Sequence, residues 1–96
     1  MQDKNFTWDR DKEKSNFKKH GVTFGEASEV FEDGNALLEA DPDHSIDEDR
    51  FIILGFSKKA QLLMVCHCYR DEDTVIRIIS ARKANPKEEK RYGGAY

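Results

Sequence analysis

Two arginines interrupt an apolar stretch in the C-terminal third of the chain. The segment "TVIRIISARKA", residues 74–84, is typical of a strand because it is rich in β-branched residues, yet it carries Arg77 and Arg82 and includes Lys83. Guanidinium groups stay charged at physiological pH and bind phosphate through paired N–H donors. His67, on the preceding apolar segment, titrates near neutrality and can transfer a proton. These residue types point to chemistry at a phosphate group.

The wider set of polar candidates matches one reaction in particular. Metal-independent RNA cleavage needs a base that deprotonates a 2′-hydroxyl, cations that stabilise the charged phosphorane and an acid that protonates the leaving oxygen. We therefore predict a catalytic group and a phosphate-binding group. The catalytic candidates are His67, Arg77, Arg82 and Tyr92, and the RNA-binding candidates are His44, Arg50, Ser80 and Lys83.

A purely structural interpretation competes with the catalytic one and is favoured when the pattern is taken alone. Arg77 would then be a solvated strand residue, Arg82 would pair with Glu88 or Glu89, and His67 would be a half-buried histidine bonded to a backbone carbonyl. The matching functional alternative is a non-catalytic interaction module whose basic C-terminal surface docks an acidic protein partner.

The motif "CHC" at residues 66–68 does not indicate a metal site. On a strand, His67 points to the face opposite Cys66 and Cys68, and the other histidines are isolated in the sequence. A disulfide between positions i and i+2 of a strand is geometrically poor, so we expect both thiols to be reduced. We expect no metal and no cofactor.

Composition and charge describe one small domain over residues 1–96. The net charge is −3, but acidic residues gather in 41–50 and basic residues dominate from 74 onward. The chain has no apolar run near the roughly 20 residues that a membrane span needs, and its N-terminal residues lack a signal segment. We therefore expect a cytoplasmic protein without a membrane partner.

Capping and turn signals divide the chain into helices and strands. Asp9 and Gly21 bound a first helix, Thr23 and Glu26 form a capping box for a second, and Asn85 with Pro86 begins a short third helix. The prediction is an α+β domain with two N-terminal helices, a four-stranded and largely antiparallel sheet, and a short C-terminal helix. The helices are expected at 10–20, 24–33 and from 86, and the strands at 35–41, 50–57, 61–69 and 74–84.

Strand alternation leaves one tension in the predicted site. Because Arg77 and Arg82 are an odd number of residues apart, a regular strand places them on opposite faces of the sheet. A bulge or the end of the strand near Ala81 would be needed to bring Arg82 to the face of Arg77.

Several motifs resemble the BrnT family of bacterial toxins from type II toxin–antitoxin systems. The resemblance implies a RelE-like fold, a ribonuclease that arrests translation and growth, and neutralisation by a BrnA-type antitoxin. It also implies that operator DNA is bound only by the toxin–antitoxin complex. The resemblance favours the catalytic interpretation without assigning a role to each residue. The matching pieces are "WD" at 8–9, "KHGVTFGEASEVF" at 19–31, "DPDHSIDEDRFIILGFS" at 41–57, "LLMVCH" at 62–67, "RIISARKA" at 77–84 and "E..RY" at 89–92.

Overall fold

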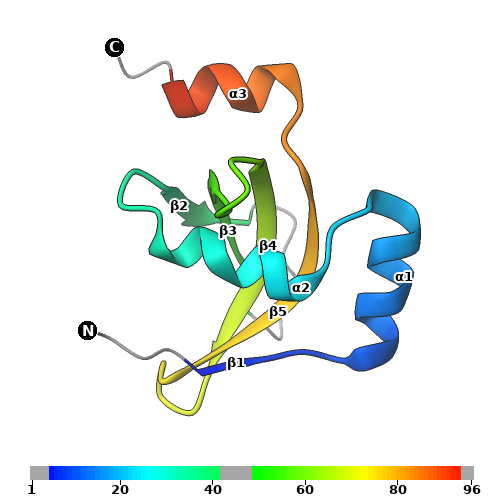
Figure 1. Ribbon diagram of the computed structural model, residues 1–96. Coiled ribbons are helices and arrows are strands. Elements are labelled where there is room, and N and C mark those ends of the chain that lie inside the picture. Colours follow the sequence, from blue (N-terminus) through cyan, green and yellow to red (C-terminus); the bar gives the residue numbers. More distant parts are fainter. Residues whose placement is uncertain (1–4, 42–48, 94–96) are drawn as a thin grey trace.

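A mixed five-stranded sheet, in the order β1-β5-β4-β3-β2, forms the centre of the molecule in the computed structural model, which describes residues 5–41 and 49–93. Helix α2 and the 3₁₀ turn η1 lie over one face, α1 lies beside β5, and α3 lies at one end of the sheet (Figure 1). The helical elements are α1 (Arg10–His20), α2 (Phe24–Ser28), η1 (Glu29–Glu32) and α3 (Pro86–Gly93). The strands are β1 (Asn5–Thr7), β2 (Leu37–Ala40), β3 (Phe51–Phe56), β4 (Leu62–Arg70) and β5 (Val75–Lys83).

Helix α1 begins and ends where its capping residues predict. The Asp9 carboxylate accepts hydrogen bonds from the N–H groups of Asp11 at 2.8 Å and Lys12 at 3.1 Å, which satisfies donors that have no partner within the helix. Gly21 closes the helix in the left-handed conformation, with φ 72°, and its N–H donates to the Phe17 carbonyl. The two ends of α1 are therefore fixed by local sequence.

The second predicted helix is shorter than expected and changes type. Thr23 caps it by accepting a hydrogen bond from the Glu26 N–H at 3.0 Å. The α-helix ends at Ser28, and the chain continues as the 3₁₀ turn η1 to Glu32. A carboxylate oxygen of Glu13 accepts a hydrogen bond from the Phe24 N–H, so α1 and α2 are also tied together.

The sheet corrects the predicted strand count and direction. The antiparallel order β2–β3–β4–β5 is as expected, but β1 adds a fifth strand that runs parallel to β5, with Asn5 paired to Val75 and Thr7 to Arg77. The prediction of four strands was wrong because three residues are too few to show the alternation that indicates a strand.

A bulge in β5 resolves the tension over the two arginines. Cys66 pairs with Ser80 while the next residue, His67, pairs with Ile78, so Ile79 has no counterpart on β4. An extra residue reverses the alternation beyond it. Arg77 and Arg82 consequently lie on the same face of the sheet.

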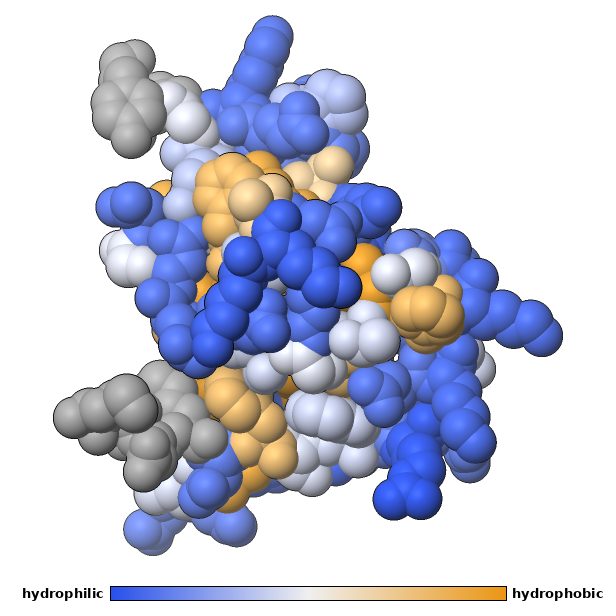
Figure 2. Space-filling view, in the orientation of Figure 1, coloured by the Kyte–Doolittle hydropathy of each residue, from blue (hydrophilic) through white to orange (hydrophobic). Residues whose placement is uncertain are grey.

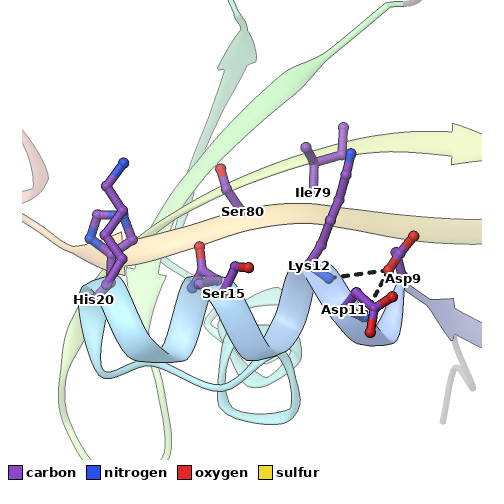
Figure 3. A pocket seen from close by; sticks show the side chains of 9 residues that line it. Asp9, Asp11, Lys12, Ser15, His20, Ile79 and Ser80 are labelled. Carbon is purple, nitrogen blue, oxygen red and sulfur yellow. Dashed lines mark hydrogen bonds between the residues drawn. The ribbon is translucent and has the colours of Figure 1, made fainter.

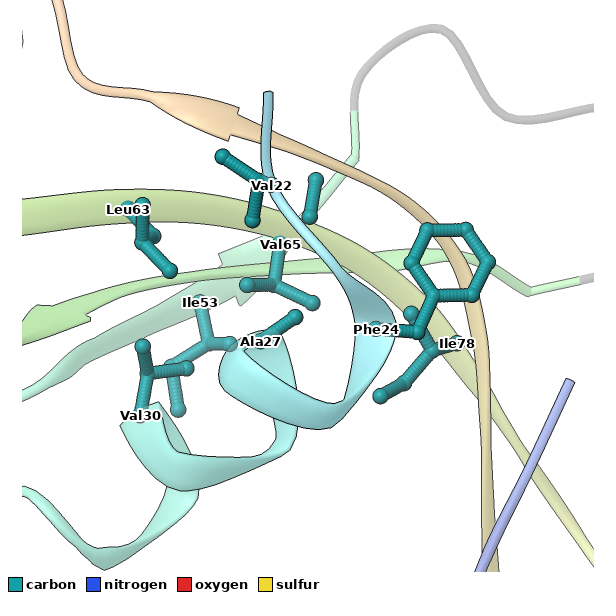
Figure 4. Close-up of a cluster of buried hydrophobic side chains, with 9 residues drawn as sticks. Val22, Phe24, Ala27, Val30, Ile53, Leu63, Val65 and Ile78 are labelled. Atoms are coloured by element: carbon teal, nitrogen blue, oxygen red, sulfur yellow. The ribbon is translucent and has the colours of Figure 1, made fainter. Parts of the chain in front are cut away.

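The opposite face of the sheet carries the core against α2 and η1 (Figure 4). Gly55 of β3 is required by close packing there, because a Cβ at this position would lie 3.0 Å from the Cβ of Ala36 and 3.2 Å from the Val30 carbonyl oxygen. The buried cluster consists of Val22, Phe24, Ala27, Val30, Ile53, Leu63, Val65, Ile78 and Ala81.

The surface over α2 is mainly hydrophilic, with apolar atoms in separate patches (Figure 2). Phe17, Leu38 and Phe56 are the large apolar side chains that are exposed within the described ranges. Among the helices of residues 5–41 and 49–93, none is long and apolar enough to cross a membrane.

Candidate active site

A pocket of about 500 Å³ lies on the face of the sheet that carries Arg82, between the C-terminal end of α1 and strands β3, β4 and β5. Parts of the chain that are distant in the sequence meet there. Helix α1 lies beside β5, while Asp41 follows β2, Arg50 precedes β3, and the Asp41 N–H donates to the Arg50 carbonyl. The lining residues are Lys19, His20, Asp41, Arg50, Ile52, Met64, Cys66, Ile79, Ser80, Ala81 and Arg82.

Cations outnumber carboxylates among these lining residues. Lys19, Arg50 and Arg82 carry positive charge, whereas Asp41 supplies negative charge. The Asp41 carboxylate accepts a hydrogen bond from the Cys66 thiol at 3.7 Å. Burial, together with the nearby Asp41 charge, raises the pKa of Cys66 to about 11, so this thiol stays protonated at neutral pH. The pocket therefore suits an anionic group and lacks a thiolate nucleophile.

Helix α1 is held against β5 by the buried side chain of Asn16. Its amide nitrogen donates to the Ala81 carbonyl at 2.7 Å and to the Val22 carbonyl at 3.2 Å, and its amide oxygen accepts from the Ala81 N–H at 3.1 Å. One turn further along α1, His20 lies on the side that faces the strand carrying Ser80 (Figure 3). The side-chain amide thus sets the distance between the helix and the strand that form the pocket wall.

A second hollow, of about 390 Å³, continues from the pocket along α1. The two hollows share Lys19, His20, Ile79 and Ser80, so together they form one trough between the helix and the bulged part of β5. The remaining lining residues of the second hollow are Asp9, Asp11, Lys12, Ser15 and Asn16 (Figure 3).

Comparison with models of protein families identifies the family of this chain. The model of the family described as "Ribonuclease toxin, BrnT, of type II toxin-antitoxin system" matches residues 8–88. The chain belongs to the BrnT family. Membership makes it a ribonuclease toxin and implies an antitoxin partner, so the family resemblance of the motifs is confirmed.

The BrnT fold is also found in a solved structure. The crystal structure of the ribonuclease toxin BrnT from Brucella abortus is similar with a TM-score of 0.62 and 20% sequence identity, covering 86% of this chain and 99% of that chain. A search among individually curated proteins finds no match. At this identity the structural likeness supports the fold, while the family match supports the activity.

Of the residues predicted for BrnT catalysis, Arg82 lies at the pocket in a bidentate ion pair. Its Nη1 and Nη2 donate to the two carboxylate oxygens of Glu88, both at 2.8 Å. The hydrogen bonds with Glu88 raise the pKa of Arg82, and those with Arg82 lower the pKa of Glu88. The ion pair with Glu88 that the structural interpretation predicted is therefore present. Arg82 nevertheless also lines the pocket.

Arg50 and Ser80, two of the predicted phosphate-binding residues, also line the pocket, whereas Arg77 and Lys83 do not. Arg77 shares the face of Arg82 but lines neither hollow, and its charge is a minor cause of the lowered pKa of Asp9, after the hydrogen bonds from the Lys12 and Asp11 N–H groups. Lys83 is exposed at the end of β5. His44 falls outside the described residues.

His67 lies in the core, on the face opposite the pocket. It is 0% exposed, and its ring packs edge-on against Phe31 with 4.8 Å between ring centroids. Its Nδ1 lies 3.3 Å from the Val65 carbonyl oxygen and its Nε2 lies 3.3 Å from the Tyr69 hydroxyl. Burial lowers the pKa of His67 to about 4, so the ring is neutral at pH 7. Its predicted catalytic role stays a prediction, but this placement does not bring it to the pocket.

Tyr92 holds α3 to the body of the molecule rather than lining the pocket. Its hydroxyl donates to the Asp33 carboxylate, and its ring packs edge-on against Phe56 with 5.0 Å between centroids. Beside it, Arg91 forms an ion pair with Glu39 of β2. The C-terminal helix is therefore attached to both β2 and β3.

Sequence reasoning missed Lys19 and His20. Each is distant in sequence from the arginines, and His20 looked isolated among the histidines. The available signal was their place in the last turn of α1, directly before Gly21, inside the motif "KHGVTF" that carries the family resemblance.

The described residues include no group of three or more His, Cys, Asp or Glu side chains arranged to hold a metal ion. The cationic groups of the pocket belong to Lys19, Arg50 and Arg82, and its other titratable side chains are His20, Asp41 and Cys66.

Proposed function

We propose that this BrnT protein is a metal-independent endoribonuclease of the cytoplasm that cleaves RNA at the pocket beside α1 and thereby arrests translation and growth. The observation that carries the proposal is the meeting of Lys19, His20, Arg50, Ser80 and Arg82 in one open pocket, although they come from separate parts of the chain. We also assign the α+β domain to the RelE-like group of folds.

The cations of the pocket suit the phosphodiester. Arg82, Arg50 and Lys19 would contact its non-bridging oxygens and stabilise the extra negative charge that develops on the phosphorane. Ser80 would donate a hydrogen bond to the same group. Arg77, on the same face of the sheet, would contact a neighbouring phosphate along the RNA.

His20 is the proton-transfer group that this geometry favours over His67, because it is partly exposed and lines the same pocket as the arginines. In the proposed step, His20 takes the proton of the 2′-hydroxyl, and the 2′-oxygen bonds to phosphorus. The bond from phosphorus to the 5′-oxygen breaks, and that oxygen takes a proton from a water molecule, whose hydroxide is neutralised by the proton that His20 took up. The products are a 2′,3′-cyclic phosphate and a 5′-hydroxyl.

The antitoxin is proposed to be of the BrnA type and to act by covering the basic pocket with an acidic or polar segment. Charge complementarity of this kind speeds association and is weakened by salt. Operator DNA would be bound by the toxin–antitoxin complex, with the antitoxin supplying the DNA-binding part.

Cleavage of RNA in EDTA by toxin freed of antitoxin tests the proposal. Wild type should cleave, His20→Ala should lose roughly 10²–10⁴ in rate, and Lys18→Ala should cleave as wild type because Lys18 lies in the same turn but outside the pocket. His67→Gln, compared at equal folded fraction, should retain activity. Full activity of His20→Ala, or cleavage that needs added Mg²⁺ or Zn²⁺, would overturn the mechanism.

A further inference from the structure

The guanidinium of Arg82 has two usable edges, and one of them is occupied. Nη1 and Nη2 together donate to the Glu88 carboxylate at 2.8 Å each, and Nη1 also donates to the Lys83 carbonyl at 3.2 Å. Of the five N–H donors of an arginine, the Nε–H and the second N–H of Nη2 are those that bond to none of the residues that the structure describes. These two lie side by side on the other edge of the planar group, which is a second fork suited to a phosphate.

Glu88 is itself held in place. One of its carboxylate oxygens also accepts a hydrogen bond from the Asn85 N–H at 2.9 Å, and the Glu88 N–H donates to the Asn85 side chain at 2.9 Å. This reciprocal pair is a capping box at the start of α3. The Glu88 side chain is 12% exposed, whereas the Arg82 side chain is 40% exposed. The carboxylate is thus fixed behind the guanidinium, and the guanidinium remains open to solvent at the pocket.

We propose that Glu88 is a positioning residue, which holds one edge of the Arg82 guanidinium so that the other edge faces the phosphodiester in the pocket. The proposal rests on the proposed function, in which Arg82 binds that group. It extends the site to α3, an element that does not line the pocket.

The physical basis is preorganisation. Arginine has a long flexible side chain, and fixing it only when RNA binds costs conformational entropy. A guanidinium already held by a fixed carboxylate does not reorganise when charge develops on the phosphorane. The opposite possibility is that Glu88 competes with phosphate for Arg82, in which case its removal would speed cleavage. The two roles therefore predict changes of opposite sign.

The test compares Glu88→Gln with Glu89→Gln in cleavage of RNA by the full chain freed of antitoxin. Glutamine has nearly the shape of glutamate and can still accept from the Asn85 N–H, but its amide nitrogen cannot accept the second guanidinium bond. We expect Glu88→Gln to lower kcat by roughly 10- to 100-fold, as a small misplacement of a catalytic contact does, with a smaller change in KM. Glu89→Gln, the exposed neighbour, should match wild type.

A double-mutant cycle separates positioning from a general structural effect. In an Arg82→Ala background, Glu88→Gln should lower kcat for RNA cleavage little further, because that background has no guanidinium to orient. Unchanged or faster cleavage by Glu88→Gln, in protein shown to be folded by thermal melts, overturns the positioning role. An equal loss with and without Arg82 also overturns it. Full activity of Arg82→Ala would instead contradict the role of Arg82 in the proposed function.

Discussion

Asn16 hydrogen-bonds both the N–H and the carbonyl of Ala81, as the backbone of a neighbouring strand would. Strand β1 pairs with β5 as far as Arg77, and beyond that point the edge of β5 has α1 beside it. The Asn16 amide therefore continues the hydrogen bonding of the sheet edge with a helix. Because Lys19 and His20 follow on the same helix, this contact also determines where they stand relative to the pocket.

Replacing the single side chain of Asn16 should lower the stability of the fold strongly. Asn16→Ala leaves the buried Ala81 N–H and carbonyl without their partner, and each unsatisfied buried group costs about 1–3 kcal/mol in the free energy of unfolding. Urea unfolding measures the loss. The matched control is Ser15→Ala, at the adjacent exposed position, which should change stability little. Equal unfolding midpoints for the two variants would show that the amide does not hold α1 to the sheet.

The buried His67 should make the protein less stable in mild acid. Burial lowers its folded-state pKa to about 4, below the unfolded value near 6.5. As pH falls below the unfolded value, the unfolded chain binds a proton that the folded chain does not, so stability is lost until the pH reaches the folded pKa. The slope in that window is about 1.4 kcal/mol for each pH unit.

His67→Gln tests this linkage because glutamine does not titrate. The variant should be less stable than wild type at pH 7, since it disturbs the contacts with Phe31 and Tyr69. Its stability should, however, change less between pH 6.5 and about 4, a window set by the two pKa values. Chemical unfolding at several pH values gives the free energy of unfolding of each protein. If this free energy changes with pH equally in wild type and variant, His67 is not the cause of the loss of stability in acid.

Most of the fold could be predicted because its signals are local. The caps Asp9, Gly21 and Thr23 mark helix ends by their own hydrogen bonds, and the short turns between β3, β4 and β5 require antiparallel pairing. Strand β1 and the bulge at Ile79 have no such local signal. The first is too short to alternate, and the second appears only when β5 is aligned with β4.

The site was predicted in part for the same reason. Arg82, Ser80 and Arg50, which line the pocket, were candidates because polar residues stand out on or beside apolar strands. His20 was missed because its place beside Ser80 depends on the packing of α1, which rests on the Asn16–Ala81 contact across most of the chain. The placement of His67 away from the pocket was not foreseen, because alternation assigns a side chain to a face of the sheet without saying which face is covered.

Tyr92→Phe should weaken the attachment of α3 rather than the chemistry. Burial alone would raise the pKa of Asp33, but hydrogen bonds from the Phe56 N–H and the Tyr92 hydroxyl hold that pKa below its usual value. A hydrogen bond to a charged group is worth about 1.5–3 kcal/mol, so thermal melts should register the loss. Because Tyr92 does not line the pocket, RNA cleavage should fall less than for His20→Ala, and an equal fall would support the predicted catalytic role of Tyr92.

RNA binding should depend on salt through the cations of the pocket. Each phosphate neutralised on a single strand contributes about −0.7 to the slope of log affinity against log salt concentration. Lys19→Ala should therefore make the slope shallower by about that amount. The measurement uses an RNA with a 2′-deoxy sugar at the scissile position, which binds without being cleaved. Lys58→Ala, an exposed lysine that does not line the pocket, should leave the slope unchanged, and a similar effect of both variants would indicate non-specific attraction.

The parallel pairing of β1 with β5 has a consequence for biosynthesis. Asn5 pairs with Val75, and α1 is bonded to Ala81, so β1 and α1 find their partners in a strand that is synthesised much later. Contacts between such distant parts of a chain form late and slow folding. A nascent chain that lacks β5 has no wall opposite Lys19 and His20 and hence no assembled pocket. The pocket, and with it the proposed nuclease activity, is therefore assembled only after β5 has been synthesised.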